Sequence, residues 1–438
     1  MINLRYILRL TFTYISRFKG FLTVGVLLGI LTFFVARFAL PFFMIETEKI
    51  GIAGRYHTDN LPEFILTMIS DGLTKTDISG TVEPSLATSW ETPDRGKTWI
   101  FYLKEGVSWQ DGSPLTSDNL TYEFSDVKID RPNDMTISFE LVNSFTPFPS
   151  IVSKPTFRKG LLGTGKWKVK KITVVGSIVQ ELILTNDLGN KKIFKFYPTF
   201  DRTRLAYKLG EIDKIIDTLD PSPFNVWKTT NIEEIISENR VVTLFFNTED
   251  ILFSDKSFRQ ALTYAIDKKI LGERAISPIS PNSWGYNSQV KQYAYDPEKA
   301  KEIIDDLSSE FLENQPIKLV SSPALLSVAE TIANNWETVG IETVIQVSSI
   351  IPDKFQAFLS IYDVPKDPDQ YSIWHSTQIS TNISHYSNPR IDKLLEDGRS
   401  ELDFEERRKI YLDFQRFLLE DSPATFLYHP IYYTISRK

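Results

Sequence analysis

The stretch GKTWIFYLKEGVSWQDGSPLTSDNL, residues 96–120, sets the architecture of the first third of the chain. Its run TWIFYL combines aromatic and β-branched residues as strands do, and QDGSP (110–114) marks a turn. Upstream, LPEFILTMISDGL (61–73) has helical periodicity and ends in Asp-Gly, a common helix end. Downstream, TISFELV follows a second turn at 131–134. Residues 80–150 are therefore expected to form strands joined by turns.

The rest of the chain alternates between strand and helix patterns. Residues 160–200 hold three strand-like runs, KWKVKKITVV, IVQELILT and KIFKFYP. In the second half, residues 254–271 repeat apolar side chains at helical spacing. A proline directly follows Asp296 and Asn388, an arrangement typical of helix N-termini. The chain is therefore expected to be a mixed α/β protein of two or three lobes.

The composition excludes several classes of protein. With 438 residues, 42% of them hydrophobic and 24% charged, the chain has the balance of a folded globular protein. It contains no cysteine, which excludes disulfides, thiolate metal sites, cysteine nucleophiles and a lipid-modified N-terminal cysteine. Residues 1–45 carry five basic groups and no acid, which leaves 44 basic against 56 acidic groups in the remainder. An acidic body of this kind disfavours nucleic acid as a partner.

The N-terminus has the character of a membrane segment. Residues 20–36 contain no charge, and a helix of that length spans about 26 Å, close to the hydrocarbon core of a bilayer. The apolar character continues past Arg37 to residue 45. Basic groups precede the segment and acidic groups follow it, so the positive-inside rule puts residues 1–19 in the cytoplasm and the body outside. We expect an uncleaved single-pass anchor at 20–45, with a cleaved secretory signal as the alternative.

Signatures of catalysis are sparse, and no cofactor is indicated. The run KGLLGTGKW (159–167) approaches a phosphate-binding loop, but Trp167 stands where a Ser or Thr must hold magnesium. We interpret it as a glycine-rich turn before a strand. The four histidines lack metal-ligand spacing, and neither HExxH nor GxSxG occurs. The acidic loop YDVPKDPDQY carries Asp363, Asp367 and Asp369, which can act as acid and base, hold a metal, anchor a cation or cap turns.

Nine stretches of the body, taken in order, resemble a known family. The family is that of the solute-binding proteins of bacterial ABC importers for oligopeptides, dipeptides and nickel, which is also called extracellular solute-binding protein family 5. The glycine turn GTGKWKV and the later run DPDQYSIWHS are two of these stretches. The full set comprises residues 69–91, 96–120, 163–169, 205–213, 245–271, 295–304, 367–376, 382–395 and 405–430.

The resemblance implies a periplasmic-binding-protein-like, bilobed α/β fold of class II type, with a small β-rich insertion and one preceding transmembrane helix. In members of the family a helical stretch usually stands where this chain runs from Glu123 straight to the strand at Asp130, so the insertion looks trimmed. The implied division is a cytoplasmic tail (1–19), an anchor (20–45), a discontinuous first lobe (46–73, 160–246 and 425–438), an inserted domain (74–159) and a second lobe (247–424).

The resemblance also implies a function without catalysis. The chain is expected to capture a peptide or related small solute in an interlobe cleft outside the membrane and to deliver it to an ABC permease. The alternatives are a tethered sensor or adhesion module with the same fold, and a surface peptidase, which would need a catalytic constellation that the sequence does not show. The lobes are expected to close by hinging near Phe246-Asn247 and just before Pro423.

The expected ligand site lies on the acidic loop. The family's ligand-binding aspartate resembles Asp363 or Asp367, with a spacing to the Asp-Pro-Asp run that differs by one residue. Asp363 is the first choice as the anchor for a ligand ammonium group, because an ionised carboxylate in a closing cleft pairs well with a cation. The full set of expected ligand-binding residues is Asp363, Asp367, Asp369, Trp374, Tyr56, His57 and Asn247.

Overall fold

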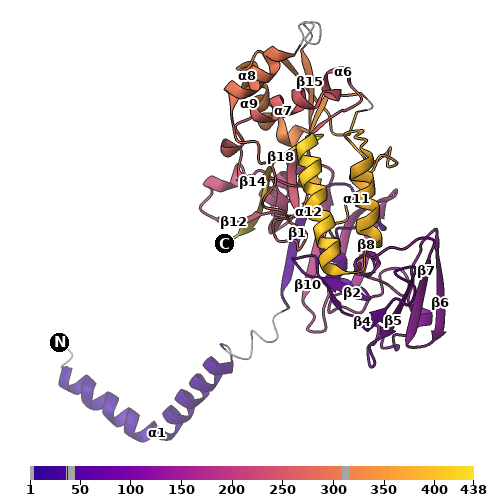
Figure 1. Cartoon of the computed structure of the whole chain (residues 1–438). Helices are drawn as coiled ribbons and strands as arrows, with labels where there is room; N and C mark the ends of the chain where they lie inside the picture. The colour runs from indigo at the N-terminus through magenta and orange to yellow at the C-terminus, as the bar shows by residue number, and fades with distance from the viewer. Residues whose placement is uncertain (1–3, 36, 38–44, 308–315, 353) are drawn as a thin grey trace.

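The computed structural model describes residues 4–35, 37, 45–307, 316–352 and 354–438 (Figure 1). A long helix, α1 (Leu4–Phe34), stands away from a body that contains two large sheets and two smaller ones. The helix bends at Phe18, whose φ of −112° and ψ of 16° leave the helical region. The expected mixed α/β architecture is confirmed.

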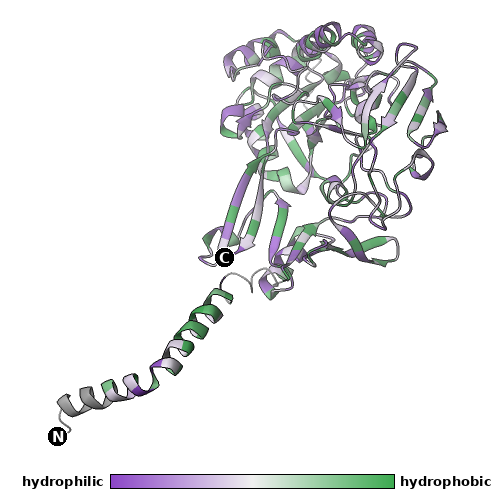
Figure 2. Ribbon diagram, turned by 90° about the horizontal axis from the view of Figure 1, so that it is seen from below, coloured by the Kyte–Doolittle hydropathy of each residue, from purple (hydrophilic) through white to green (hydrophobic). Residues whose placement is uncertain are grey.

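The helix that carries most of the expected anchor is therefore not straight. Among the described residues, no single straight helix is long and apolar enough to cross a bilayer. The two parts Phe12–Phe21 and Thr23–Phe34, which meet at 60°, reach that length and composition only together. Figure 2 shows hydrophobic residues concentrated in the part of the helix nearer the body. Residues 36 and 38–44 of the expected anchor lie outside the described residues.

The first large sheet has seven strands in the order β12-β19-β11-β1-β10-β9-β8. Its central strand, β1 (Thr47–Ala53), runs parallel to both neighbours, β10 (Lys191–Tyr197) and β11 (Lys214–Thr218). Helices α3 (Glu63–Ile69) and α5 (Phe200–Leu209) pack on this sheet through buried apolar residues. The remaining strands pair antiparallel: β8 (Lys168–Val175), β9 (Ile178–Thr185), β12 (Thr230–Ile236) and β19 (Ile431–Arg437).

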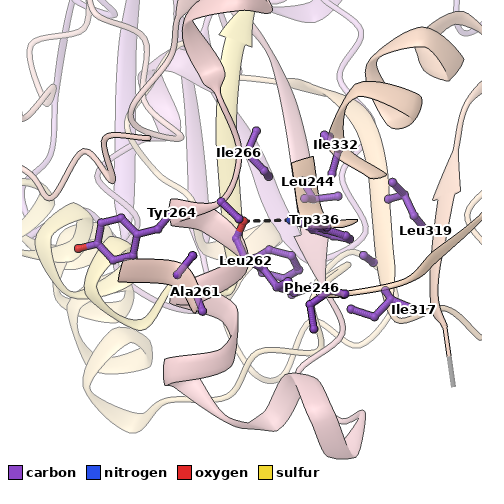
Figure 3. Packing of buried hydrophobic residues seen from close by; sticks show 14 of the residues in the cluster. Leu244, Phe246, Ala261, Leu262, Tyr264, Ile266, Ile317, Leu319, Ile332 and Trp336 are labelled. Carbon is purple, nitrogen blue, oxygen red and sulfur yellow. Dashed lines mark hydrogen bonds between the residues drawn. The ribbon is translucent and has the colours of Figure 1, made fainter. Parts of the chain in front are cut away.

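The second large sheet has six strands in the order β14-β18-β13-β17-β15-β16. Its core centres on Trp336 of α9 (Leu326–Glu337), whose indole Nε1 donates to the carbonyl oxygen of Leu262 in α7 (Lys256–Tyr264) at 3.0 Å (Figure 3). Helix α7 lies within the run where the apolar stripe was predicted. The six strands are β13 (Arg240–Phe246), β14 (Glu273–Arg274), β15 (Ile317–Ser321), β16 (Thr343–Val347), β17 (Ala357–Asp363) and β18 (Ala424–His429).

The helix starts predicted from the sequence are confirmed in this lobe. The side chain of Asp296 accepts the Lys299 N–H at the start of α8, and that of Asn388 accepts the Arg390 N–H at the start of α11. Both caps satisfy backbone donors that a helix leaves unpaired. Besides α7 and α9, the described residues of this lobe form the helices α6 (Ile251–Ser254), α8 (Pro297–Asp306), α10 (Tyr371–Trp374), α11 (Pro389–Ser400) and α12 (Phe404–Asp421).

The inserted domain is a four-stranded antiparallel sheet in the order β4-β5-β7-β6, preceded by a two-stranded ribbon. After the short 3₁₀ turn η2 (Ser117–Asn119), the described chain enters β6 with no further helix, as the sequence predicted for this stretch. A cluster of aromatic side chains fills the core of this domain. The elements are β2 (Thr74–Thr76), β3 (Val82–Pro84), β4 (Ala87–Glu91), β5 (Thr98–Leu103), β6 (Val127–Asn133), β7 (Thr136–Leu141) and α4 (Phe148–Ile151).

Strand pairing draws the border between the lobes differently from the expected division. β13 pairs with β17 and β18 in the six-stranded sheet, although residues 240–246 and 425–429 were expected in the first lobe. Every residue of β13 after Arg240 is buried, so an apolar run of this kind fits the middle of either sheet and its sequence does not select one.

The chain crosses between the two sheets at 237–239 and at Pro430. The two crossings touch, since the Ser237 N–H donates to the Pro430 carbonyl oxygen at 3.0 Å. The hinge positions expected from the sequence, Asn247 and Pro423, lie instead at the opposite ends of β13 and β18. The crossing segments, and not those positions, join the two lobes.

Candidate functional site

Five side chains from both sheets gather where the chain crosses between the lobes. Arg240, at the start of β13, donates from Nη1 to Asp217 Oδ1 at 2.7 Å and from Nε to Asp363 Oδ1 at 3.1 Å. Its guanidinium carbon lies 4.4 Å from the ring centroid of Tyr432. Tyr56, which follows β1, is close enough for the charges of Asp217 and Arg240 to affect the pKa of its phenol. We call these five residues the junction cluster.

Asp217 reaches the cluster through an irregularity in its strand. Its φ of 60° lies in the left-handed region, and the pairing of β11 with β19 shifts between Ile215 and Thr218. A bulge of this kind redirects a side chain, and strained backbone is often concentrated at functional positions. The bulge accounts for an acidic side chain of the first lobe that contacts Arg240 at the start of the second.

The cluster carries one more carboxylate than it has cations. Burial opposes the charge of Arg240, but the hydrogen bond and charge of Asp217 outweigh it and raise the pKa of the guanidinium. Burial, with a contribution from Asp217, raises the pKa of the Tyr56 phenol, so this group stays neutral near pH 7. Two carboxylates, Asp217 and Asp363, therefore share one guanidinium.

Asp363 is the carboxylate of the cluster that a ligand can reach. Its side chain is 84% exposed, and its ion pair with Arg240 uses the oxygen Oδ1. Asp217, in contrast, receives both terminal nitrogens of Arg240. An exposed ion pair contributes little to stability, so little is lost when Asp363 exchanges Arg240 for a cationic ligand. Asp363 is therefore the exposed carboxylate of the junction cluster.

Asp367, the second choice for the anchor, has a different role. It is 8% exposed, and both its oxygens accept from Arg407 of α12, at 3.0 Å from Nη1 and 2.6 Å from Nη2. Its Oδ1 also accepts the backbone N–H of Asp369. The assignment of Asp367 to the ligand is therefore corrected, because a buried and fully partnered carboxylate holds the loop onto α12.

Asp369 and Trp374 also belong to the packing of the second lobe. Asp369 pairs with Arg399 of α11 at 3.0 Å, and its other oxygen accepts the Tyr371 N–H. Burial raises the pKa of Asp369, and the charge of Arg399 opposes that shift. Trp374 is 1% exposed and lies in the apolar cluster between the sheet and α12. The structure therefore does not place either side chain on an open wall of a cleft.

His57 and Asn247 lie outside the junction cluster. The ring Nδ1 of His57 donates to the carbonyl oxygen of Ser177, in the turn between β8 and β9. Asn247 donates from its amide to the carbonyl oxygen of Phe355 and accepts the N–H of Glu249, which are contacts of a turn. Of the seven residues expected from the sequence, the structure brings together Asp363 and Tyr56.

The lobes also touch away from the crossing segments. Lys366, in the loop after β17, pairs with Glu63 of α3 at 2.7 Å. The Trp284 N–H donates to the Ser79 carbonyl oxygen at 3.0 Å, and the Thr146 N–H donates to that of Arg399 at 2.7 Å. The second lobe therefore contacts both the first lobe and the inserted domain.

We predict that Lys366→Ala weakens ligand binding by about fivefold. The pair with Glu63 is half exposed and holds the lobes together, so its loss lowers the stability of the closed state by at most about 1 kcal/mol. Isothermal titration with the ligand that copurifies with the protein measures the change. Lys75→Ala is the matched control, because Lys75 pairs with Glu83 inside the two-stranded ribbon. Equal affinities of the two variants would contradict a role in closure.

Among the cavities formed by the described residues, three lie at the border of the inserted domain. One of about 700 Å³ lies beside β8 and the turn at 110–111, and one of about 770 Å³ lies between α3 and residues 154–161. The third, of about 650 Å³, lies between this domain and α11 and is lined by Tyr371 and Arg399 among others. The lining residues of these three cavities do not include the junction cluster.

Sequence reasoning missed Arg240, Asp217 and Tyr432. The available signal was the single charge at the start of the apolar run RVVTLFF. A charged residue at the end of a buried strand lies near the surface and not in the core. Asp217 gives no such signal, since its position depends on a bulge. Among the described residues, no three His, Asp or Glu side chains are grouped as a metal site.

Comparison with protein families gives one clear result. The profile described as "Bacterial extracellular solute-binding proteins, family 5 Middle" matches residues 81–139 and 121–378. The oligopeptide-binding protein AppA of Bacillus subtilis is 25% identical over 460 residues, covering 86% of this chain and 83% of its own. The dipeptide-binding protein of Escherichia coli is 24% identical and covers 82% of this chain and 83% of its own.

Solved structures show the same fold. NikZ from Campylobacter jejuni, in complex with Ni(L-His), aligns with a TM-score of 0.75 and 21% identity over 90% of this chain and 94% of its own. AppA from Bacillus subtilis, in complex with a nonapeptide, aligns with a TM-score of 0.69 and 22% identity over 90% and 95%. The two bound ligands differ in kind, so the shared fold does not by itself select a ligand.

Proposed function

Because the chain belongs to family 5 of the bacterial extracellular solute-binding proteins, we propose that it is the membrane-anchored binding subunit of an ABC importer. It captures peptides between its two lobes and delivers them to a permease in the membrane. The family and the relatives are binding proteins of transporters, so the chain is a binding protein and not an enzyme.

The observation that carries the choice of ligand is the uncompensated carboxylate of the junction cluster. A peptide presents an ammonium group at one end, and Asp363 offers an accessible oxygen within the junction cluster. Charge-assisted hydrogen bonds of this kind are stronger than neutral ones, and they strengthen further as a closing cleft excludes water. A nickel chelate, as bound by NikZ, is the second candidate, on the strength of the fold alone.

Mass spectrometry of the molecules released from the purified, heat-denatured protein tests this choice. We expect short peptides with free N-termini. A metal chelate without peptide, or acidic solutes that lack an ammonium group, would contradict it. Uptake of the identified peptide should also stop in cells that lack the protein, which separates a transport subunit from a tethered sensor.

For the attachment, we predict that the mature protein keeps residues 20–45. The apolar helix and the charges on either side of it support an anchor whose N-terminus is cytoplasmic. N-terminal sequencing of the protein from the membrane fraction measures this directly. A mature N-terminus between residues 37 and 50 would show a released signal peptide and contradict the anchor.

A further inference from the structure

The strand ends on one side of the seven-stranded sheet lie around the start of β1, where the chain arrives from α1. We call this end of the sheet the entry edge. β10 starts opposite the first residue of β1, so the turn between β9 and β10 lies at this edge. The Asp213 N–H bonds the Lys49 carbonyl oxygen, and the Arg437 N–H bonds that of Asp213, so the end of α5 and the C-terminus lie there too. Figures 1 and 2 show the C-terminus on the side of the body from which α1 projects.

Large apolar side chains are exposed along this edge. Leu188, in the turn between β9 and β10, is 81% exposed, Leu209 at the end of α5 is 66% exposed, and Val226 before β12 is 77% exposed. Trp227 is partly exposed next to Val226. We call these four residues the apolar rim. Single exposed apolar residues are ordinary, but these come from three separate loops at the same end of one sheet.

The charges around the rim differ from those of the rest of the body. Asp187 is paired with Lys168 at 2.7 Å, which leaves Glu46, Glu211 and Asp213 as the nearby acids. Against them stand Lys208, Lys228, Arg437 and Lys438. The rim therefore lacks the large acidic excess of the body, so it repels an anionic surface less than an average face of the body does.

The connection to α1 keeps this edge close to the membrane. Residues 35–46 link α1 to β1, and a chain of that length reaches at most about 42 Å when fully extended. Ile45 already lies beside Gly189, in the same turn as Leu188. A tether this short gives the rim a high effective concentration at the bilayer surface, so weak contacts suffice to hold it there.

We infer that the apolar rim rests on the lipid bilayer, with its leucines, valine and tryptophan at the boundary between headgroups and acyl chains. The junction cluster lies at the opposite edge of the same sheet, because Tyr56 follows β1 and Asp217 is near the end of β11. A body docked through the rim therefore holds its ligand site away from the membrane, in an orientation for capture. Delivery to a permease then requires the apolar rim to dissociate from the bilayer. This inference rests on the proposed membrane anchor.

Site-specific fluorescence tests the docking, because the chain has no cysteine of its own. Full-length Leu188→Cys and Leu209→Cys variants, each labelled with a fluorophore, are placed in lipid nanodiscs that contain nitroxide-headgroup lipid and no other protein. We expect both labels to lose most of their fluorescence. Ile251→Cys, equally exposed but on the second lobe, is the matched control and should keep its fluorescence. A second set carries the label at Val226→Cys. In this set, the double substitution Leu188→Ser with Leu209→Ser should reduce the quenching of that label relative to Val226→Cys alone.

The outcomes separate the two proposals. Protein that stays with the nanodiscs but shows equal quenching at all positions overturns the docking and leaves the anchor intact. Quenching at the rim that occurs only after permease subunits are added overturns it as well, because the occupant is then a protein. Protein that does not stay with the nanodiscs overturns the anchor, and the docking with it.

Discussion

Replacing Asp363 with asparagine is expected to weaken peptide binding by about 2 kcal/mol, which is roughly 30-fold in Kd. The substitution keeps the shape of the side chain and removes the charge that pairs with the ligand ammonium. The effect is placed at the low end of the range for charged pairs because Asp363 is exposed and shares Arg240 with Asp217. Titration of the peptide identified by mass spectrometry into the purified variant measures the change.

A matched control distinguishes the anchor from a general effect of charge. Asp187→Asn makes the same change at a side chain that is 81% exposed and also paired with a basic group, but at the far edge of the sheet. It should bind as the parent does. If Asp363→Asn binds as tightly as Asp187→Asn, the ammonium anchor lies elsewhere and the junction cluster is only a structural contact.

Replacing Asp367 with asparagine is expected to lower the free energy of unfolding of the second lobe by about 3–5 kcal/mol. The change leaves Arg407 buried without its charge partner, beside the rings of Trp284 and Tyr411. A buried ion pair costs this much when one partner is removed, because the other charge stays desolvated. Urea unfolding followed by tryptophan fluorescence measures the change, and Trp284 lies 5.2 Å from the guanidinium as a local reporter.

The comparison is with an ion pair on the surface. Glu140→Gln breaks the exposed contact between Glu140 and Lys128, at 2.9 Å, and should cost less than about 1 kcal/mol. Peptide affinity of folded Asp367→Asn should stay near that of the parent, since Asp367 faces α12. A large loss of affinity with unchanged stability would instead return Asp367 to the ligand site.

The sequence by itself determined the features that depend on neighbouring residues. Asp296 and Asn388 start helices because their side chains accept backbone donors two or three positions ahead. The strand runs of 160–200 and the direct passage into β6 follow from local alternation and turn residues. The ordered set of family-like stretches predicted the family, because those stretches extend along most of the body, and the family profile matches residues 81–378, where most of them lie.

Only the tertiary structure decided which acid of the loop 363–369 is accessible. The three aspartates have similar local sequences, but Arg399 and Arg407, on helices that follow 30 and 40 residues later, occupy Asp369 and Asp367. Asp363 stays exposed, and its partner, Arg240, is also bound by Asp217 from the other sheet. The sheet that β13 joins was decided in the same way. Strand pairing and ion pairing between distant segments depend on the three-dimensional packing, and spacing along one chain does not encode it in a readable form.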